Sequence, residues 1–517
     1  MSVYSVGDGL GQPAQQAGGG LGAFAQLPQG RPLSRRLSPQ DAAFLHFDSE
    51  EAPMNVGFLG VFEGEVPFDK FVDNIASKLH LVPRYRQRVV PVPLGAGRPT
   101  WEPDPDFDIG RHIRRLRLAP PGTGEQLMDL AGRLYAGRLD RGKPLWEMHF
   151  VEGLQGGRTG LFAKVHHCLV DGVGGIDLMM VTLDLSPDPP PVAPPAEPYS
   201  PPHIPGRAAR FLDAVFDSMA ERVDRWAAFQ RGLADLTLGG HMEPARTVRR
   251  ALEVALPYFT LPVTPAPFNG PFSGGRKLAC SEISFQEVRA VRKACGGTVN
   301  DVVLAVLGGA LRRYLELHGE TTRGRLLRIV TPVNVRREDE RGTFGNRISL
   351  LAVELPVGIR DPLALLRAVT ERTSELKRDH VADGVERAAG LLVGLPAPLI
   401  SAASSLPLPS NRVVHMVCTN VPGPMIPLYT VGHRLLAAYP LVPITWEMGI
   451  GCAVMSYNQK LYFGLVADAG AGADVRRLKG FLEESWVELR AAAKVAEPAL
   501  PEILPATERA GSRTAAA

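Results

Sequence analysis

The chain has 517 residues, of which 45% are hydrophobic and 21% are charged, and it carries a formal net charge of +3. This length exceeds the usual span of one hydrophobic core, so we expect a large globular protein with two domains. The near-balanced charge gives no whole-chain case for nucleic-acid binding. The five cysteines are scattered and odd in number, which argues against a disulfide framework and favours a reducing cytoplasm.

Three regions of the chain do not have the pattern of a folded domain. Residues 1–36 are rich in Gly, Gln and Ala and lack the apolar core of a signal peptide, so we expect a flexible tail there and a second one over 496–517. Residues 388–408 are uncharged over a length that raises the question of a transmembrane helix. Three prolines interrupt that stretch, which favours an apolar surface element or the wall of a substrate channel.

The first predicted domain covers residues 37–185. A helix is predicted over 125–138, followed by strands over 146–152 and 160–167. The last of these strands ends in the most informative run of the chain, Lys164-Val-His-His-Cys-Leu-Val-Asp-Gly172. It brings together a possible base, a possible structural anion and a tight turn.

His166 and His167 are consecutive, so at the end of a strand their side chains face opposite ways. One imidazole can then face a cavity while the other packs behind it, which suits a single general base, since neutral histidine titrates near cellular pH. The spacing argues against zinc, because chelating histidine pairs usually lie three to five residues apart and no Cys-x-x-Cys or His-x-x-His accompanies this pair.

Less specific interpretations of the same run stay open. An isolated histidine pair most often serves structural hydrogen bonding. Asp171 can be only a turn residue, and Gly172 only a left-handed backbone position. Cys168, next to the histidines, is a candidate nucleophile, but a buried cysteine commonly serves as a small hydrophobic residue.

A proline-rich linker over 186–206 separates the two halves. It contains ten prolines, which favour extended polyproline geometry and a semi-rigid connection. A helical connection is predicted over 207–270, because residues 207–233 place apolar side chains at helical spacing opposite charged ones. That amphipathic face indicates either packing against the body of the protein or a membrane-surface helix.

The second predicted domain covers residues 271–495 and alternates strand and helix patterns. Ser284 and Glu287 have the spacing of a capping box for a helix that ends near Cys295. A longer helix starts at Thr298 or Asn300 and ends near Gly319. A third begins with proline after Asp361. Strands are predicted over 277–283, 326–333, 348–355, 413–419 and 462–466. This mixed order predicts an α/β sheet covered by helices.

Five motifs in order resemble one known family. The pattern His-His-x-x-x-Asp-Gly resembles the acyltransferases of the chloramphenicol acetyltransferase superfamily. Four further motifs narrow the resemblance to the bacterial wax ester synthase/diacylglycerol acyltransferase family, and the whole set covers roughly residues 37–490. These four are Leu37-Ser-Pro-Gln-Asp-Ala-Ala-Phe44, Pro144-Leu-Trp146, Asn300-Asp301 and Asn420-Val-Pro-Gly-Pro424.

The resemblance implies two chloramphenicol acetyltransferase-like α/β domains with a substrate channel between them. It implies transfer of a long-chain acyl group from acyl-coenzyme A, as a co-substrate and with no further cofactor or metal, to diacylglycerol or a fatty alcohol. It also implies a cytoplasmic protein at the inner face of the plasma membrane or on lipid droplets. The alternative is a non-catalytic lipid-binding or droplet-coating protein that retains the fold.

The resemblance also implies roles for individual residues. His167 would be the general base, His166 would support the loop, and Asp171 would hold the motif in place. Asn300 and Gly172 would contact substrate, although Asn300 can equally be only a helix cap. Pro144-Leu145-Trp146 would be structural. The chain lacks an Asp-Phe-Gly-Trp signature, which weakens the plant-type acyltransferase and condensation-domain interpretations. It also lacks a Gly-x-Ser-x-Gly elbow, a Walker loop and a Gly-x-Gly-x-x-Gly fingerprint, which removes the main support for hydrolase, kinase and dehydrogenase interpretations.

Overall fold

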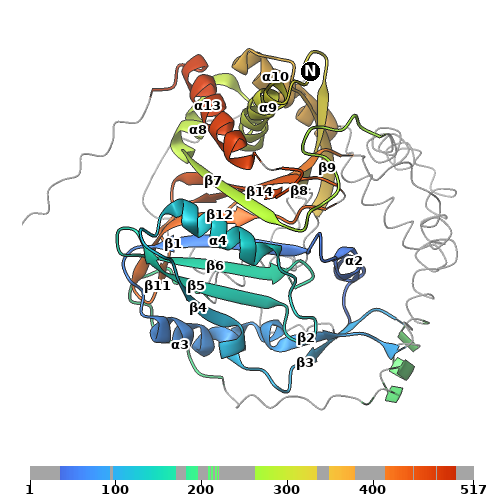
Figure 1. The fold of residues 1–517 in the computed structure, drawn as a ribbon, viewed down its shortest axis with the longest axis vertical. Helices are drawn as coiled ribbons and strands as arrows, with labels where there is room; N and C mark the ends of the chain where they lie inside the picture. Colours follow the sequence, from blue (N-terminus) through green and yellow to red (C-terminus); the bar gives the residue numbers. More distant parts are fainter. Residues whose placement is uncertain are drawn as a thin grey trace, which may run out of the picture.

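The computed structural model describes residues 35–93, 97–169, 182–195, 262–334, 348–378, 414–445, 447–472 and 474–496, with several helical positions between 206 and 219. Two six-stranded sheets carry the fold, and helices pack against them (Figure 1). The predicted mixed α/β class with two sheet-containing halves is therefore confirmed. The limits of the individual segments stay predictions.

Sheet 1 has the strand order β11-β12-β1-β6-β5-β4. Strands β4 and β5 are parallel, and the other neighbouring pairs are antiparallel. A separate two-stranded hairpin joins β2 and β3. The strands are β1 (Asn55–Phe62), β2 (Gln87–Val90), β3 (Thr100–Pro103), β4 (Ile113–Arg117), β5 (Trp146–Leu154), β6 (Arg158–His166), β11 (Tyr429–Thr430) and β12 (His433–Leu441). The predicted strands over 146–152 and 160–167 correspond to β5 and β6.

Strand β12 belongs by sequence to the second half of the chain but by hydrogen bonding to sheet 1. It runs antiparallel to β1, with Gly57 opposite Leu441 and Phe62 opposite Leu435. The hydroxyl of Tyr457 holds the start of this segment, because it accepts a hydrogen bond from the Leu428 amide and donates one to the Leu435 carbonyl, both at 2.9 Å. The two halves are thus joined by a shared sheet as well as by packed side chains.

Sheet 2 has the order β7-β14-β13-β10-β8-β9. Strand β10 is parallel to both β8 and β13, and the remaining neighbouring pairs are antiparallel. All five strands predicted for the second half lie in this sheet. Four of them agree with the structure within two residues at each end, and the one predicted over 413–419 corresponds to β10, which begins three residues later. The strands are β7 (Arg276–Ser284), β8 (Leu326–Asn334), β9 (Ile348–Pro356), β10 (Met416–Val421), β13 (Ile450–Tyr457) and β14 (Lys460–Asp468).

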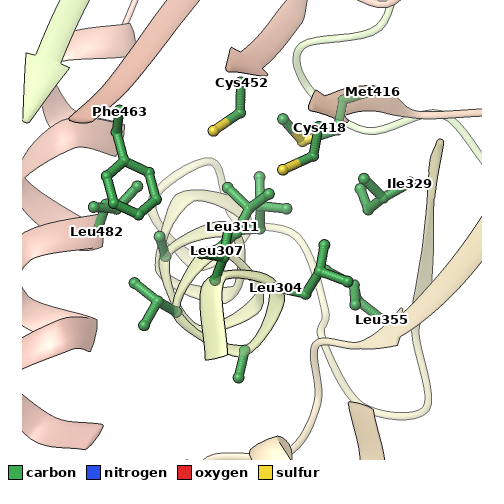
Figure 2. Close-up of a cluster of buried hydrophobic side chains, with 14 of the residues drawn as sticks. Leu304, Leu307, Leu311, Ile329, Leu355, Met416, Cys418, Cys452, Phe463 and Leu482 are labelled. Atoms are coloured by element: carbon green, nitrogen blue, oxygen red, sulfur yellow. The ribbon is translucent and has the colours of Figure 1, made fainter. Parts of the chain in front are cut away.

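The helix α9 (Val299–Leu317) is the centre of the core on sheet 2. Its leucines Leu304, Leu307 and Leu311 are fully buried, and Figure 2 shows them facing side chains of the sheet. Helices α8 (Phe285–Cys295), α10 (Pro362–Arg378) and α13 (Val475–Ala492) pack around it. Residues 302–311 of this helix are buried and apolar on every side, so their hydrophobic pattern alone does not distinguish them from part of a membrane helix.

The helix boundaries largely follow the predicted capping residues. Ser284 caps α8, but Glu287 does not complete the capping box and instead pairs with Arg490 at 2.8 Å. The start of α9 is capped by Thr298, not Asn300. The side chain of Asp361 accepts from the amide of Ala364 and caps α10.

Helix α4 (Gly124–Ala136), predicted over 125–138, lies where the two sheets meet (Figure 1). Its buried Leu127 and Tyr135 form one cluster with Phe162 of sheet 1 and with Leu278 and Val466 of sheet 2. Helices α2 (Pro39–Phe47) and α3 (Phe68–Lys78) belong to the first half of the chain. Short 3₁₀ helices complete this half at Leu79–Leu81, Pro83–Arg86 and Ile109–Arg111.

The apolar stretch over 388–408 lies outside the described residues, as does most of the amphipathic stretch over 207–233. Within the described part of the chain, no single helix is long and apolar enough to cross a membrane. The pair α8 and α9 meets the length and composition requirements only jointly, and it is bent by 98°.

We predict that Gly464→Ala destabilises the protein, because a Cβ at this position of β14 would lie 1.8 Å from the Pro440 carbonyl oxygen of β12. Overpacking of this kind costs about 1–3 kcal/mol or more. Gly480→Ala is the matched control, since Gly480 lies within α13 with nothing near the added methyl group. It should stabilise by about 0.5–1 kcal/mol. Urea unfolding measures both changes, and equal stability of the two variants would contradict the prediction.

Candidate active site

Strand β6 ends at His166, and His167 is the first residue of the turn that follows. Backbone hydrogen bonds fix the pair, because His166 donates to the Leu145 carbonyl at 2.9 Å and His167 donates to the Met54 carbonyl at 2.7 Å. The two histidines are thus held from the strands on both sides of β6. Asp171 and Gly172 lie outside the described residues.

His166 is buried and faces the loop that follows α2. Its Nδ1 accepts a hydrogen bond from the Cys168 amide at 3.1 Å, so the proton of the neutral ring resides on Nε2. That Nε2 lies 3.8 Å from Oδ1 of Asp48, which is too long for a hydrogen bond but favourable for an N–H dipole and a carboxylate. Burial lowers the pKa of His166 from 6.5 to about 4, so the ring is neutral at physiological pH.

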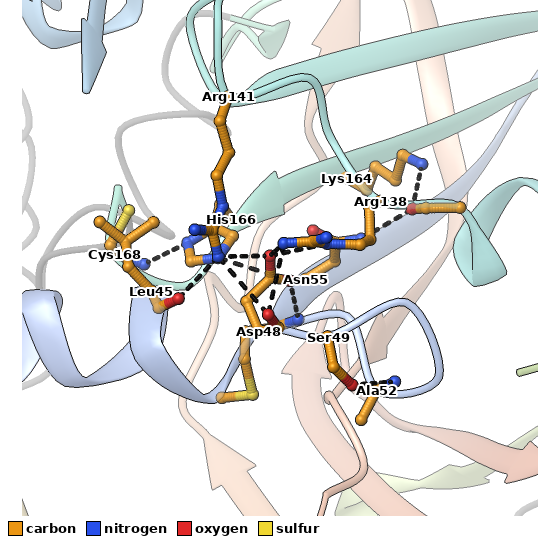
Figure 3. A network of polar contacts seen from close by, with 12 residues as sticks. Leu45, Asp48, Ser49, Ala52, Asn55, Arg138, Arg141, Lys164, His166 and Cys168 are labelled. Atoms are coloured by element: carbon orange, nitrogen blue, oxygen red, sulfur yellow. Dashed lines mark hydrogen bonds and ion pairs between the residues drawn. The ribbon is translucent and has the colours of Figure 1, made fainter. Parts of the chain in front are cut away.

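Asp48 is the centre of the polar network around His166 (Figure 3). Its Oδ2 accepts from Arg138 at 2.6 and 3.0 Å and from Arg141 at 2.8 Å, while its Oδ1 accepts from the Met54 amide at 3.0 Å. Burial opposes ionisation, but these donors and His166 outweigh it and hold the pKa of Asp48 below its usual 3.8. The carboxylate is therefore charged although only 3% of the side chain is exposed.

The two arginines that bind Asp48 lie just after the C-terminal end of α4, which Lys164 holds in place. The Lys164 ammonium group donates to the carbonyls of Leu134 and Gly137, both at 2.8 Å. It thereby supplies hydrogen bonds to two carbonyl groups at the C-terminal end of the helix. Arg138 and Arg141 follow in the connection to β5. The lysine of the histidine motif thus has a structural role of its own.

His167 is half-buried and stacks on Phe44 of α2, with ring centroids 3.9 Å apart and an interplanar angle of 28°. Burial lowers the pKa of His167, and the interaction with its own backbone carbonyl partly offsets this effect. The Nδ1 is buried without a regular hydrogen bond. The ring is therefore a neutral imidazole held between an aromatic face and its own backbone.

Cys168, the other candidate in the motif region, does not gain a chemical role. Burial raises the pKa of the Cys168 thiol far above its usual range, so it is a poor nucleophile and the interpretation as a small hydrophobic residue is favoured. Within the described ranges, no group of three or more His, Cys, Asp and Glu side chains is placed to hold a metal ion.

Trp146 is a structural residue, as predicted. It is fully buried, its Nε1 donates to the Tyr85 carbonyl at 2.8 Å, and its ring stacks on His112 with centroids 4.5 Å apart. Its backbone carbonyl also accepts from Nδ1 of His112 at 2.8 Å. These contacts fix the start of β5, next to the strand that carries the histidines.

Asn300 and Asp301 lie in the first turn of α9, in the half of the molecule built on sheet 2. Asp301 is buried and closes the helix cap, since its Oδ2 accepts from the amide and hydroxyl of Thr298 at 2.7 and 2.8 Å. Its Oδ1 accepts from the Thr373 hydroxyl at 2.7 Å. Asp301 is thus structural, and no hydrogen bond among the described residues joins Asn300 to either histidine, so its contact with substrate stays a prediction.

Asp48 and Phe44 contact the histidines, but the sequence did not identify them. Phe44 lies in a motif that was noted only for its resemblance to the family. Asp48 is part of an acidic run, Asp48-Ser-Glu-Glu51, that has the pattern of a solvated loop. Its partners Arg138 and Arg141 are about 90 residues away in sequence, so no local spacing connects them.

We predict that His166→Gln makes stability less dependent on pH. The folded pKa of about 4 lies below the ordinary 6.5, so the unfolded chain binds more protons between these values and stability falls as the pH drops through this window. The glutamine variant lacks this pH-dependent contribution. Urea unfolding at several pH values measures the difference, and parallel curves for both proteins would contradict it, since the other histidines are common to both.

Known proteins match this chain over most of its length. A family model described as the wax ester synthase/diacylglycerol acyltransferase catalytic domain matches residues 37–303, and one described as the WS/DGAT C-terminal domain matches residues 344–490. The protein named probable diacyglycerol O-acyltransferase tgs1 from Mycobacterium tuberculosis is 32% identical over 464 residues, which are 89% of this chain and 96% of that protein. The protein named tgs2 from the same species is 32% identical over 472 residues, 88% of this chain and 99% of that protein.

Solved structures agree in fold. A wax ester synthase/diacylglycerol acyltransferase from Marinobacter aquaeolei VT8 matches with a TM-score of 0.62 and 24% identity over 89% of this chain and all of that one. The first condensation domain of the calcium-dependent antibiotic synthetase matches with a TM-score of 0.55 and 15% identity over 89% of this chain and 97% of that one. With the family models and the relatives above, these likenesses lead to one conclusion: the chain belongs to the wax ester synthase/diacylglycerol acyltransferase family.

Proposed function

We propose that this protein transfers a long-chain fatty acyl group from acyl-coenzyme A to the hydroxyl group of diacylglycerol, which gives triacylglycerol. The names of the relatives with 32% identity support diacylglycerol as the acceptor. The observation that carries the proposal is the neutral, half-buried imidazole of His167 at the end of β6. A fatty alcohol presents the same hydroxyl on an apolar body, so the same base can also serve wax ester synthesis.

His167 is the proposed general base. In this mechanism the neutral ring carries its proton on Nδ1, and the Nε2 lone pair accepts the proton of the acceptor hydroxyl. The hydroxyl loses its proton to Nε2 as its oxygen attacks the thioester carbonyl. The tetrahedral intermediate then collapses, and the imidazolium returns the proton to the departing coenzyme A sulfur. No acyl-enzyme is required.

His166 is unsuited to the same task. Its Nδ1 lone pair is engaged by the Cys168 amide, and its Nε2 carries the proton, directed toward Asp48. Its pKa of about 4 leaves it a weak base at neutral pH. We therefore assign it the supporting role, with Asp171 holding the motif, while Asn300 and Gly172 orient substrate from a channel between the halves.

A positioned general base contributes roughly 10²–10⁴-fold to the rate. The remaining acceleration comes from orientation of two apolar substrates and from stabilisation of the oxyanion. A lipid-binding protein without activity would need neither a neutral imidazole nor the network that holds its neighbour. The arrangement of the histidines therefore favours the enzyme over that alternative.

We predict that His167→Ala lowers kcat by about 10²–10⁴-fold while the melting temperature changes little, because a base is lost at the edge of the core. The purified protein is incubated with palmitoyl-coenzyme A and either diacylglycerol or hexadecanol, and free thiol and lipid ester are both measured. Asp171→Ala is expected to lower the melting temperature as well as the turnover.

His433→Ala is the control, since this histidine begins β12, its Nδ1 bonds to the Glu63 carbonyl at 2.7 Å, and it lies beyond the end of β1 opposite to the one that pairs with His166. It should keep wild-type turnover. An active His167→Ala enzyme would rule out the proposed base. Thiol release without ester would indicate a thioesterase, and neither product in the wild-type protein would favour the lipid-binding alternative.

We further propose that the protein binds the surface of a membrane or lipid droplet, from which its apolar substrates come. Leu212, Phe216 and Met219 lie on one side of a helical stretch and are 53%, 67% and 58% exposed. Asp213 and Asp217 of the same stretch pair with Arg35 and Arg36. The ion pairs hold the stretch to the protein while apolar side chains remain exposed, which suits an interfacial contact.

We predict that serine at all three apolar positions reduces binding to vesicles of phosphatidylcholine with a minor share of phosphatidylglycerol by at least about tenfold, because the buried apolar area is lost. Co-sedimentation measures the bound fraction. Val487→Ser is the control, since this side chain is 51% exposed but lies on α13. Equal binding of the wild-type and triple-variant proteins would refute the proposed contact.

A further inference from the structure

The segment from Phe44 to Met54 contacts both histidines. Phe44 stacks on the ring of His167, and the Met54 carbonyl accepts from the backbone amide of the same residue. Asp48, between them in sequence, faces Nε2 of His166. One short segment thus bears on the orientation of both histidine side chains.

Both carboxylate oxygens of Asp48 form hydrogen bonds that hold this segment in place. Oδ1 accepts from the Met54 amide, six residues further along, and so closes the loop whose last carbonyl holds His167. Oδ2 accepts from Arg138 and Arg141 and ties the loop to the connection after α4. Arg141 also donates to the Leu45 carbonyl at 2.6 Å, so the end of α2 is held by the same side chain.

The second half of the molecule contributes to the same loop. Arg276 of β7 donates to the Glu51 carbonyl at 2.6 Å, and its other Nη pairs with the fully buried Asp468 at 3.1 Å. The loop is therefore anchored from sheet 1 at Asp48 and from sheet 2 at Glu51. Its position therefore depends on how the two halves are placed relative to each other.

A buried carboxylate is a costly way to hold a loop. Two ions lose solvation when an ion pair is buried, and an apolar contact of similar volume often stabilises at least as well. The negative charge does something that an apolar contact cannot do. It faces the Nε2–H of the neutral His166 ring and compensates the charge of two guanidinium groups that lie beside it.

We propose that Asp48 is a positioning residue for acyl transfer, which fixes the orientation of His166 directly and that of His167 through the loop to Met54. The inference rests on the proposed role of His167 as the base. Asp48 touches no substrate in this scheme. It acts because a displacement of the base by about 1 Å can cost about a hundredfold in rate.

The test compares Asp48→Asn with Asp184→Asn in the full-length protein. Asp184 also forms a buried ion pair, at 2.6 Å, but with Lys78 at the end of α3, and its backbone pairs with Tyr429 of β11. Both variants remove one carboxylate from a buried pair, so both should lower the melting temperature. At a temperature where both are folded, a purely structural role predicts equal kcat.

We expect Asp48→Asn to lower kcat by about 10–100-fold, with KM for palmitoyl-coenzyme A within about twofold of wild type. Asp48→Glu should recover part of the loss, because the charge returns on a longer side chain. Asp184→Asn should keep kcat within about twofold. Wild-type kcat in Asp48→Asn, together with an inactive His167→Ala, would overturn the role of Asp48 alone, whereas an active His167→Ala would overturn the base itself.

Arg138→Gln provides a second variant in case Asp48→Asn does not fold. Arg138 is one-third exposed, and its removal leaves Asp48 bonded to Arg141 and Met54, so the folded state should persist. We expect kcat to fall by about 3–10-fold at unchanged KM. Wild-type kcat in this variant would overturn the proposal.

Discussion

Everything at this site depends on the desolvation of two neighbouring imidazoles in two different surroundings. One is buried beside a charged network at the end of β6, and the other stacks on an aromatic ring at the start of the turn that follows. Burial lowers both pKa values and keeps both rings neutral. Hydrogen bonds then separate their roles, because the Nδ1 lone pair of His166 accepts from the Cys168 amide, whereas neither ring nitrogen of His167 is hydrogen-bonded to another of the described residues.

The architecture around this pair follows from the way two sheets share strands and packing. Strand β12 leaves the second half and pairs with β1, which is itself the neighbour of β6. Helix α4 fills the junction, and the loop from Asp48 to Met54 is tied to both halves. A site built at such a junction depends on the relative placement of the halves more than a site built within either one.

Local patterns predicted much of this, and the successes have a common cause. The strand ending at the histidines, the proline at the start of α10 and the cap at Ser284 each depend on residues that are close in sequence. Asn300 shows the limit of the method. By propensity, both Asn300 and Thr298 are acceptable N-cap residues. Thr298 is the N-cap of α9 because Asp301 can then bond to Thr298 and to Thr373 of α10 at the same time.

The sequence by itself determined the class of fold, the strand that presents the histidines and the resemblance to the family, because each rests on local spacing or on ordered motifs. Only the tertiary structure decided that Asp48 supports His166, that Phe44 stacks on His167 and that β12 joins sheet 1. Those contacts join residues tens to hundreds of positions apart, so no periodicity records them. Chain packing brings these residues together, and packing also sets the desolvation that makes the imidazoles neutral.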